Sequence, residues 1–226
     1  MKILSLDTST NNFSLCVADG EKVLAKKDIV LNKILSDSIV PTIDKVLTKA
    51  KVPLSELDGF AVGLGPGSFT SLRVGLSTVK ALAFAGGKPV VGIPSLDVIA
   101  QGVPAQKNQD ICVVCDARRS LVYAAFYRKQ GQRLTRRGKY LLAGIEAVLS
   151  QVTEPTLVVG NGIALFREAI KKAKGTEITL AEEKFWYPRA VNLSQLAYSK
   201  FSKKEYNDID SLVPLYLYSK DCQVVR

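Results

Sequence analysis

The sequence of 226 residues contains no histidine. Histidine is the commonest general base and metal ligand, and it activates the nucleophile of Ser-His and Cys-His enzymes, so its absence excludes sites of these kinds. Cysteine is scarce as well, at positions 16, 112, 115 and 222, which is too few for a disulfide-stapled secreted domain. Cys112 and Cys115 point to opposite faces of a predicted strand, so we expect no metal site and no redox function there.

Long apolar runs are also absent. Asp7 follows the N-terminus too closely for the apolar segment of a signal peptide, and no run approaches the length of a membrane-spanning helix. The hydrophobic content of 47% is that of an ordinary globular protein. We therefore expect a cytoplasmic protein that does not bind a membrane.

The first half of the chain alternates strand and helix patterns. Three β-prone runs joined by short turn signals predict an antiparallel meander. Apolar residues at helical spacing, a continuous apolar run and a glycine-rich turn then predict helices and buried strands in alternation. The expected strands are 3–7, 13–18, 22–30, 59–64 and 89–93, and the expected helices are 36–51, 68–85 and a short one from Ser95.

The second half repeats this order. A first strand again ends in a carboxylate, Asp116 in place of Asp7, and a second strand follows over 121–127, before a turn at Gly131. Further elements are expected at 143–151, 156–160, 163–174 and 192–201, with a late strand or an extended tail at 215–218. Such a duplication predicts the α/β fold of actin-like proteins, sugar kinases and heat-shock ATPases, a ribonuclease H-like fold with two subdomains. We place them at 1–105 and 106–226.

The turns that follow the two carboxylates lack glycine. Thr8 and Ser9 follow Asp7, and Ala117 and Arg118 follow Asp116, so neither backbone can approach a phosphate as closely as a glycine-rich loop does. Two roles remain open for Asp7: it holds a metal-bound water in a vestigial nucleotide or metal site, together with Asp116, or it accepts hydrogen bonds at its own turn.

The most specific segment runs from Gly63 to Leu76, where a strand gives way to a helix. Its glycines permit a tight turn, and Ser68 or Thr70 is expected to cap the helix. A helix start can bind an anion, but the Gly-Lys-[Ser/Thr] of a P-loop is missing. Small residues at positions 71, 75 and 81 favour close packing of this helix against a neighbouring element.

Four segments of the chain resemble the TsaB (also called YeaZ) family. They are the opening 3–9, Asp116-Ala117-Arg118 with Val122-Tyr123, Pro214 to Leu217, and above all the glycine-rich turn with the helix start behind it. The residues of that turn are Gly65, Pro66, Gly67, Ser68, Phe69, Thr70 and Arg73. The chain departs from the family's usual glycine at Ser71, which leaves less room for close packing.

The resemblance implies a required, non-catalytic subunit of the complex that forms N6-threonylcarbamoyladenosine in tRNAs that read codons starting with A. In this family the subunit binds and activates the TsaD transferase, recruits the TsaE ATPase and also self-associates, so a homodimer is expected in the absence of the partner. The resemblance implies no cofactor for the chain alone, ATP or ADP at the complex, and contact with tRNA through the complex.

The resemblance also implies that the two N-terminal helices contact TsaD. The expected interface residues are the apolar residues at helical spacing on each helix, although part of each stripe must cover the chain's own sheet. These candidates are Ile39, Ile43, Val46 and Leu47 on the first helix, and Leu72, Leu76, Val79 and Leu82 on the second.

Two other functions remain open. One is an ATP-dependent transferase or a hydrolase in its own right that uses Asp7 and Asp116. The other is a stand-alone RNA-binding module, because the net charge of +10 is concentrated in the second half and the stretch 128–139 is strongly basic. That stretch is also explained as a solvated hairpin edge protected by charge, or as a contact for an acidic partner.

Overall fold

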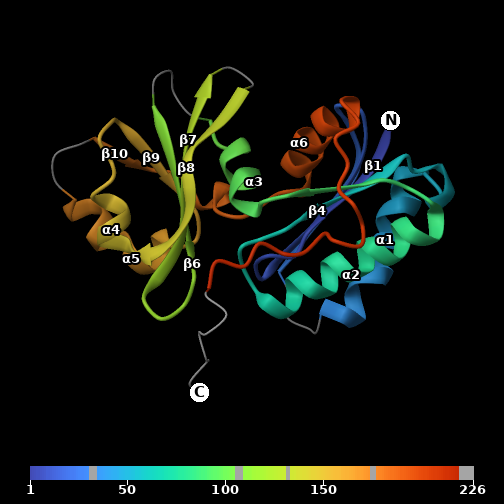
Figure 1. The fold of residues 1–226 in the computed structure, drawn as a ribbon, viewed down its shortest axis with the longest axis horizontal. Coiled ribbons are helices and arrows are strands. Elements are labelled where there is room, and N and C mark those ends of the chain that lie inside the picture. The colour runs from blue at the N-terminus through green and yellow to red at the C-terminus, as the bar shows by residue number, and fades with distance from the viewer. Residues whose placement is uncertain (31–34, 105–108, 131–132, 174–176, 219–226) are drawn as a thin grey trace. The chain divides into compact units, whose positions relative to one another are not determined.

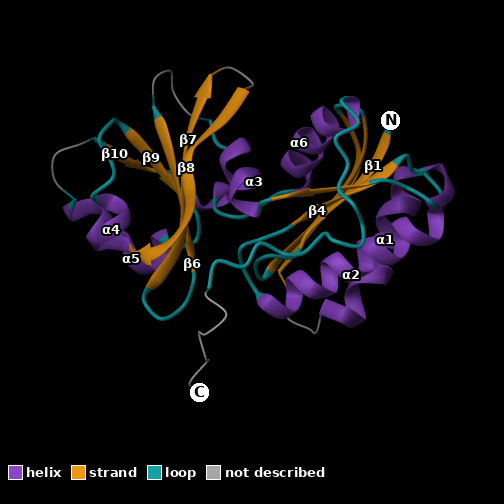
Figure 2. Ribbon diagram, in the orientation of Figure 1, coloured by secondary structure: helices purple, strands orange, loops and turns teal. Residues whose placement is uncertain are grey.

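The computed structural model describes residues 1–30, 35–104, 109–130, 133–173 and 177–218. The chain forms two compact units. Unit 1 comprises Met1–Val98 and Pro188–Leu215, and unit 2 comprises Ile99–Tyr187 and the residues from Tyr216 onward. Each unit consists of a sheet with helices packed on it (Figures 1 and 2).

The sheet of unit 1 begins with the predicted antiparallel meander. β1 (Lys2–Asp7), β2 (Asn12–Asp19) and β3 (Lys22–Val30) pair in turn, and Gly20 adopts a positive φ of 58° in the tight turn between the second and third strands. β4 (Gly59–Gly63) and β5 (Val90–Ile93) extend the sheet in parallel from β1. The strand order is β3-β2-β1-β4-β5.

Helices cover both faces of this sheet. α1 (Leu35–Ala50) and α2 (Phe69–Gly86) share one apolar core with Leu4 and Leu6 of β1. α6 (Ala190–Ser202) packs on the other face, where Leu193 and Phe201 contact the cluster around Ile3. Successive side chains of a strand point to opposite faces, so β1 supplies both cores. The 3-10 turn η1 (Leu54–Glu56) follows α1.

The sheet of unit 2 has the same topology. β6 (Asp110–Asp116), β7 (Leu121–Gln130) and β8 (Arg133–Gly144) form a second meander, and β9 (Thr156–Val159) and β10 (Ile178–Leu180) pair in parallel, giving the order β10-β9-β6-β7-β8. α4 (Ile145–Leu149) and α5 (Ile163–Lys172) pack on it. The match between the two sheets confirms the predicted duplication. The predicted turn at Gly131 lies outside the described residues.

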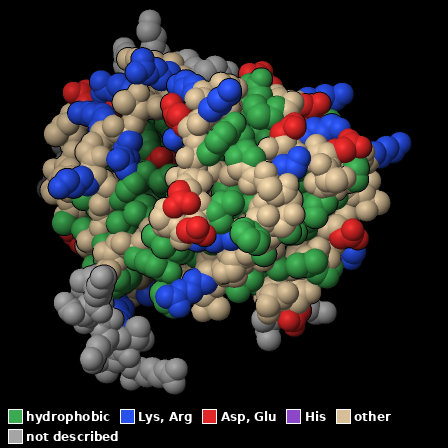
Figure 3. All heavy atoms as spheres, turned by 45° about the vertical axis from the view of Figure 1, so that its right-hand side comes forward, with side chains coloured by type: hydrophobic (Ala, Val, Ile, Leu, Met, Phe, Trp, Pro, Cys, Tyr) green, Lys and Arg blue, Asp and Glu red, His purple; other side chains and the backbone are tan. Residues whose placement is uncertain are grey.

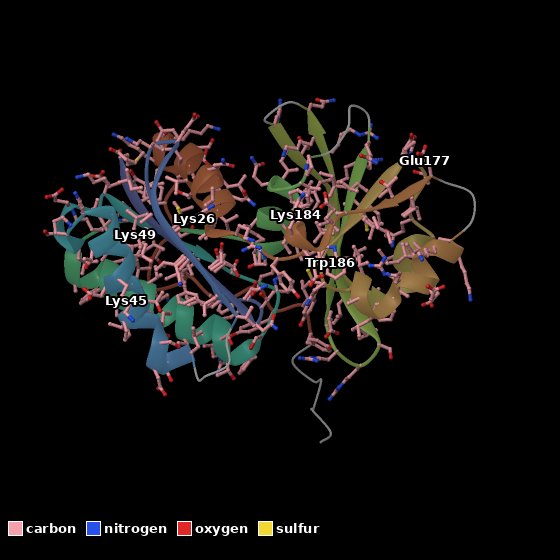
Figure 4. All side chains as sticks on the ribbon, turned by 180° about the vertical axis from the view of Figure 1, so that it is seen from behind. Lys26, Lys45, Lys49, Glu177, Lys184 and Trp186 are labelled. Carbon is pink, nitrogen blue, oxygen red and sulfur yellow. The ribbon has the colours of Figure 1, made fainter. Side chains whose placement is uncertain are left out.

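Trp186 closes the core of unit 2 after the 3-10 turn η2 (Glu183–Phe185). Its side chain, labelled in Figure 4, is buried, and its indole Nε1 donates a hydrogen bond to the carbonyl oxygen of Ala181 at 2.9 Å. The indole N–H is therefore satisfied inside an apolar environment.

The predicted division of the chain at residue 105 is wrong. The chain passes from unit 1 to unit 2 within α3 (Ser95–Gln101) and returns before α6, the last helix of the second copy. α6 belongs to unit 1 because its apolar face covers the second face of the first sheet, and the backbone N–H of Ala190 donates to Ser14 Oγ at 2.7 Å. The segment 215–218 forms no strand, which leaves the extended tail of the two alternatives.

Candidate functional site

Asp7 ends β1 and is completely buried. Its Oδ1 accepts hydrogen bonds from the backbone N–H of Ser9 at 2.8 Å and from the Ser9 hydroxyl at 2.6 Å, and its Oδ2 accepts one from the Ser95 hydroxyl at 2.6 Å. Burial raises the pKa of the Asp7 carboxyl, and these hydrogen bonds oppose the rise. Of the two roles expected for Asp7, the geometry supports the carboxylate that accepts hydrogen bonds at its own turn.

The glycine-rich turn between β4 and α2 closes over this carboxylate. The N–H of Gly65 donates to Ser95 Oγ at 3.0 Å, and the N–H of Ser95 donates to the carbonyl of Gly65 at 2.7 Å. The N–H of Ser68 donates to the carbonyl of Ser9 at 2.8 Å. The family-motif turn and the Asp7 turn, which are far apart in the sequence, therefore form one hydrogen-bonded network.

Glycine is required at two positions of this network. A Cβ at Gly63 would lie 1.9 Å from Asp7 Oδ2, and a Cβ at Gly67 would lie 2.0 Å from the carbonyl oxygen of Ser9. Pro66 between them is buried. The space in front of the Asp7 carboxylate is thus filled by backbone of the chain itself.

The start of α2 differs from the expected cap. Ser68 occupies the N-cap position but its side chain caps no backbone N–H, and its hydroxyl donates instead to Ser71 Oγ at 2.9 Å. Thr70 is exposed. The guanidinium of Arg73 lies 3.8 Å from the centroid of the exposed Phe69 ring, a cation–π contact at the surface.

Small residues of α2 let this helix pack closely on the turn after β1. The hydroxyl of Thr8 donates to the carbonyl of Ser71 at 2.8 Å, and a Cβ at Gly75 would lie 2.3 Å from Thr8 Oγ1. Ser71 and Gly75 therefore let α2 approach the turn that follows β1. Ala81, the third predicted member of this stripe, is exposed and takes no part in that approach.

Asp116 occupies the equivalent position at the end of β6 in unit 2. Its side chain is 17% exposed, and its Oδ1 accepts a hydrogen bond from the N–H of Arg118 at 2.7 Å. The three residues after Ala117, which are Arg118, Arg119 and Ser120, all have positive φ, at 65°, 51° and 58°. Since Asp7 lies in unit 1 and Asp116 in unit 2, each carboxylate is held within its own unit.

The expected interface residues are, with one exception, core residues of unit 1. Seven of the eight are buried residues of α1 and α2, each no more than 8% exposed: Ile39, Ile43, Val46, Leu47, Leu72, Leu76 and Val79. Leu82 is half-buried. Most of these candidates therefore cover the chain's own sheet, as the apolar stripe of an amphipathic helix does. Ile43, Leu47 and Leu82 also line the groove described below.

Other apolar side chains of the same helices are exposed. Val40 on α1 is 59% exposed, Leu54 on η1 is 42% exposed, and Phe84 near the end of α2 is 81% exposed. Sequence reasoning placed none of them among the interface candidates. The signal that could have identified them is that each lies outside the buried stripe of its helix or beyond it.

A shallow groove of about 380 Å³ lies between α1, η1 and α2. Its walls include Val40, Leu47, Leu54 and Leu82, with Asp44 and Lys51 beside them. Lys45 and Lys49, labelled in Figure 4, are exposed on α1. Figure 3 shows apolar side chains reaching the surface among charged ones on the face that it displays. We call this groove the helix surface.

Comparison with known proteins places this fold. The family model described as "TsaD: tRNA N6-adenosine threonylcarbamoyltransferase" matches residues 30–224. A Bacillus subtilis protein named "tRNA threonylcarbamoyladenosine biosynthesis protein TsaB" is 28% identical over 96% of this chain and 94% of its own length. The chain belongs to the family of this model and, within it, to TsaB (YeaZ).

Solved structures agree with this membership. A Pseudomonas aeruginosa protein described as uncharacterized "with similarity to peptidase YEAZ" superposes with a TM-score of 0.82 at 25% identity, covering 96% of this chain and 99% of that one. The activator of the 2-hydroxyisocaproyl-CoA dehydratase from Clostridium difficile, solved with bound ADPNP, has a TM-score of 0.52 at 13% identity, covering 92% and 99%. The second likeness shows the shared fold alone.

Two absences among the described residues bear on the site. None of the helices there combines the length and the apolar character needed to cross a membrane. Within the same residues, no group of three or more Cys, Asp or Glu side chains is arranged to hold a metal ion.

Proposed function

We propose that this chain is a non-catalytic subunit that takes part in forming N6-threonylcarbamoyladenosine in tRNA. Membership of TsaB (YeaZ) carries the proposal, and the closed Asp7 network supports its non-catalytic part. A carboxylate whose oxygens accept three hydrogen bonds from its own chain is not presented to a substrate. The absence of histidine leaves no imidazole to act as a base.

The subunit acts by binding a TsaD homologue through the helix surface. An apolar centre with a polar rim is typical of a protein–protein interface. The TsaD model itself matches this chain, so the partner has helices of the same kind to offer. Recruitment of a TsaE homologue and binding of ATP or ADP belong to the assembled complex, and a homodimer through the same surface is the state without the partner.

The test replaces exposed residues of the helix surface, so that the fold is retained. Val40→Glu and Leu54→Glu are each expected to weaken binding to the TsaD homologue about tenfold or more, as the loss of an interface anchor does. Leu165→Glu is the matched control, because Leu165 is 64% exposed on α5 of unit 2. Isothermal titration measures binding, and a reconstituted modification assay measures activity.

Wild-type affinity in both variants would overturn the assignment of the surface. Full tRNA modification without this chain would overturn the assignment of the function. The alternative, a transferase or hydrolase that uses Asp7 and Asp116, predicts instead that neutral replacements of these two residues abolish activity in a complex that still assembles.

A further inference from the structure

β8 is an edge strand of the described sheet of unit 2, and the sequence in and around it is basic. From position 117 to position 145 the chain has eight Lys and Arg residues and no Asp or Glu. Six of the eight lie between positions 128 and 139, on β7 and β8. Some of these charges are neutralised or hydrogen-bonded within the protein itself, and others are not.

Three of the six are held by groups within unit 2. Arg128 Nε lies 2.6 Å from Asp110 Oδ1, and Arg137 pairs with the other oxygen of the same buried carboxylate. Lys129 Nζ donates to the carbonyl oxygens of Gln101 at 2.8 Å and of Val103 at 3.1 Å. These cations tie the hairpin to the rest of the unit.

The other three, Arg133, Arg136 and Lys139, are exposed on β8. Within the described part of the chain, no carboxylate lies within 4.0 Å of their charged nitrogens. Arg128 and Arg137, by contrast, both lie within this distance of Asp110. The guanidinium of Arg136 lies 3.9 Å from the centroid of the Tyr140 ring. We call these three residues the β8 cationic edge.

The pairing register shows on which faces of the sheet these cations lie. Arg133 lies opposite Gln130 and Arg136 opposite Tyr127, and residues three apart on a strand point to opposite faces. Positive side chains therefore flank the outer backbone edge of β8 on both sides. Backbone N–H groups along such an edge are hydrogen-bond donors that no neighbouring strand uses.

We propose that the β8 cationic edge binds the phosphate backbone of RNA. Arginine on both sides of a row of backbone donors, with an aromatic ring beside it, suits a chain of phosphates. A peptide strand fits less well, because dense like charge and the positive φ of 76° at Gly138 disfavour strand addition at an edge. Edge protection alone could use charge of either sign, whereas this hairpin uses only positive charge.

The proposal rests on the proposed function, which makes the RNA a transfer RNA bound while this chain is in its complex. The experiment titrates an unmodified tRNA transcript into the complex of this chain with the TsaD homologue at several salt concentrations. The variant is R133Q/R136Q/K139Q. Its control, R167Q/K171Q/K172Q, removes the same charge from exposed positions of α5 in the same unit.

The variant is expected to bind tRNA about tenfold more weakly, and its plot of log affinity against log salt is expected to be shallower by about 2 to 3, as for three lost phosphate contacts. The control is expected to stay within about twofold of the wild type. Circular dichroism of both variants shows that the sheet is retained, and sedimentation shows that each still assembles with the TsaD homologue.

Assembly and tRNA binding are measured separately, so a complex that fails to form contradicts the proposed function and not this inference. The inference is overturned if the variant keeps wild-type tRNA affinity and salt slope, whether or not it now self-associates as an unprotected edge would. It is also overturned if the control loses as much affinity, or if the variant loses only a protein partner such as the TsaE homologue.

Discussion

The two halves of this molecule carry the same strand order but bury their first carboxylate to different degrees. In unit 1 the glycine-rich turn packs on Ser9, two residues after Asp7, and buries the acid completely. In unit 2 the corresponding turn packs on a residue that precedes the carboxylate. The N–H of Gly162 donates to the carbonyl of Val114, two residues before Asp116. Ala117 after it is buried, but Arg118, Arg119 and Ser120 are exposed.

This difference shows how the turn at the same place in two sheets can take two roles. The closed turn of unit 1 fixes the start of α2 and therefore one wall of the helix surface. The open turn of unit 2 keeps an exposed arginine, with the Arg118 side chain 88% exposed. We expect replacement of Gly67 and of Asp7 in the closed turn to cost more stability than replacement of Gly162 and of Asp116 in the open turn.

The largest effect is expected for Gly67→Ala. The new methyl group would lie 2.0 Å from the carbonyl oxygen of Ser9, a backbone atom that cannot move without opening the turn. The free energy of unfolding should fall by at least about 3 kcal/mol, at the upper end of overpacking costs. Urea denaturation measures it. The matched change Gly162→Ala, at 2.9 Å from the Val114 carbonyl oxygen, should cost only about 1 kcal/mol; equal losses would contradict the comparison.

Asp7→Ala should have the next largest effect, about 2 kcal/mol. It leaves the buried hydroxyls of Ser9 and Ser95 without their acceptor, and the removal of a buried charge offsets part of that loss. Asp116→Ala removes a partly exposed ion pair with Arg118 and should cost less than about 1 kcal/mol. Thermal unfolding compares the two variants, and the reverse order would show that the unit 2 turn is the structural one.

The raised pKa of Asp7 predicts a pH dependence. Because the folded-state pKa lies above the value of 3.8 for an unperturbed Asp, the folded protein binds the proton more tightly than the unfolded chain. This contribution to stability is present at low pH and is lost as the pH rises from 3.8 through the folded pKa. Asp7→Asn does not titrate, so its stability relative to the wild type should increase over that pH range and then level off. A difference that is flat across this range would contradict the raised pKa.

The smallest effect concerns backbone conformation. Ser120 has a φ of 58°, which costs a residue with a side chain about 1 kcal/mol, and Ser120→Gly should therefore stabilise the protein by less than about 1 kcal/mol. Gly87 ends α2 with a φ of 61° in unit 1, so Gly87→Ala should destabilise the protein by about 1 kcal/mol. Calorimetry can resolve both changes, and destabilisation by Ser120→Gly would indicate a contact of the serine side chain that the strain argument omits.

Much of the fold follows from local patterns. The meander 3–30, the helix from position 68 and the repeat of the whole order after Asp116 were predictable because strand alternation, helical spacing and turn residues are short-range signals. The packing of α6 on the first sheet was not predictable from such signals. Its apolar face suits either sheet, and only three-dimensional fit decides between them.

The site was predictable only in part. The glycine-rich turn and Asp7 were identified, but Ser95, which lies 88 residues from Asp7 in the sequence, could not be assigned as its partner without coordinates. The burial of most interface candidates has a different cause. Helical periodicity detects the face that the protein buries, so residues such as Ile39 and Val79 were selected by the property that removes them from the surface.

The most direct test of the central claim is the rate of tRNA modification in a complex reconstituted with the double variant Asp7→Asn, Asp116→Asn. The variant is first shown to be folded and bound to the TsaD homologue. A non-catalytic subunit predicts a rate within about twofold of the wild-type complex, because neither carboxylate handles substrate. A rate that falls to the level seen without this chain, in a complex that is fully assembled, would contradict the account.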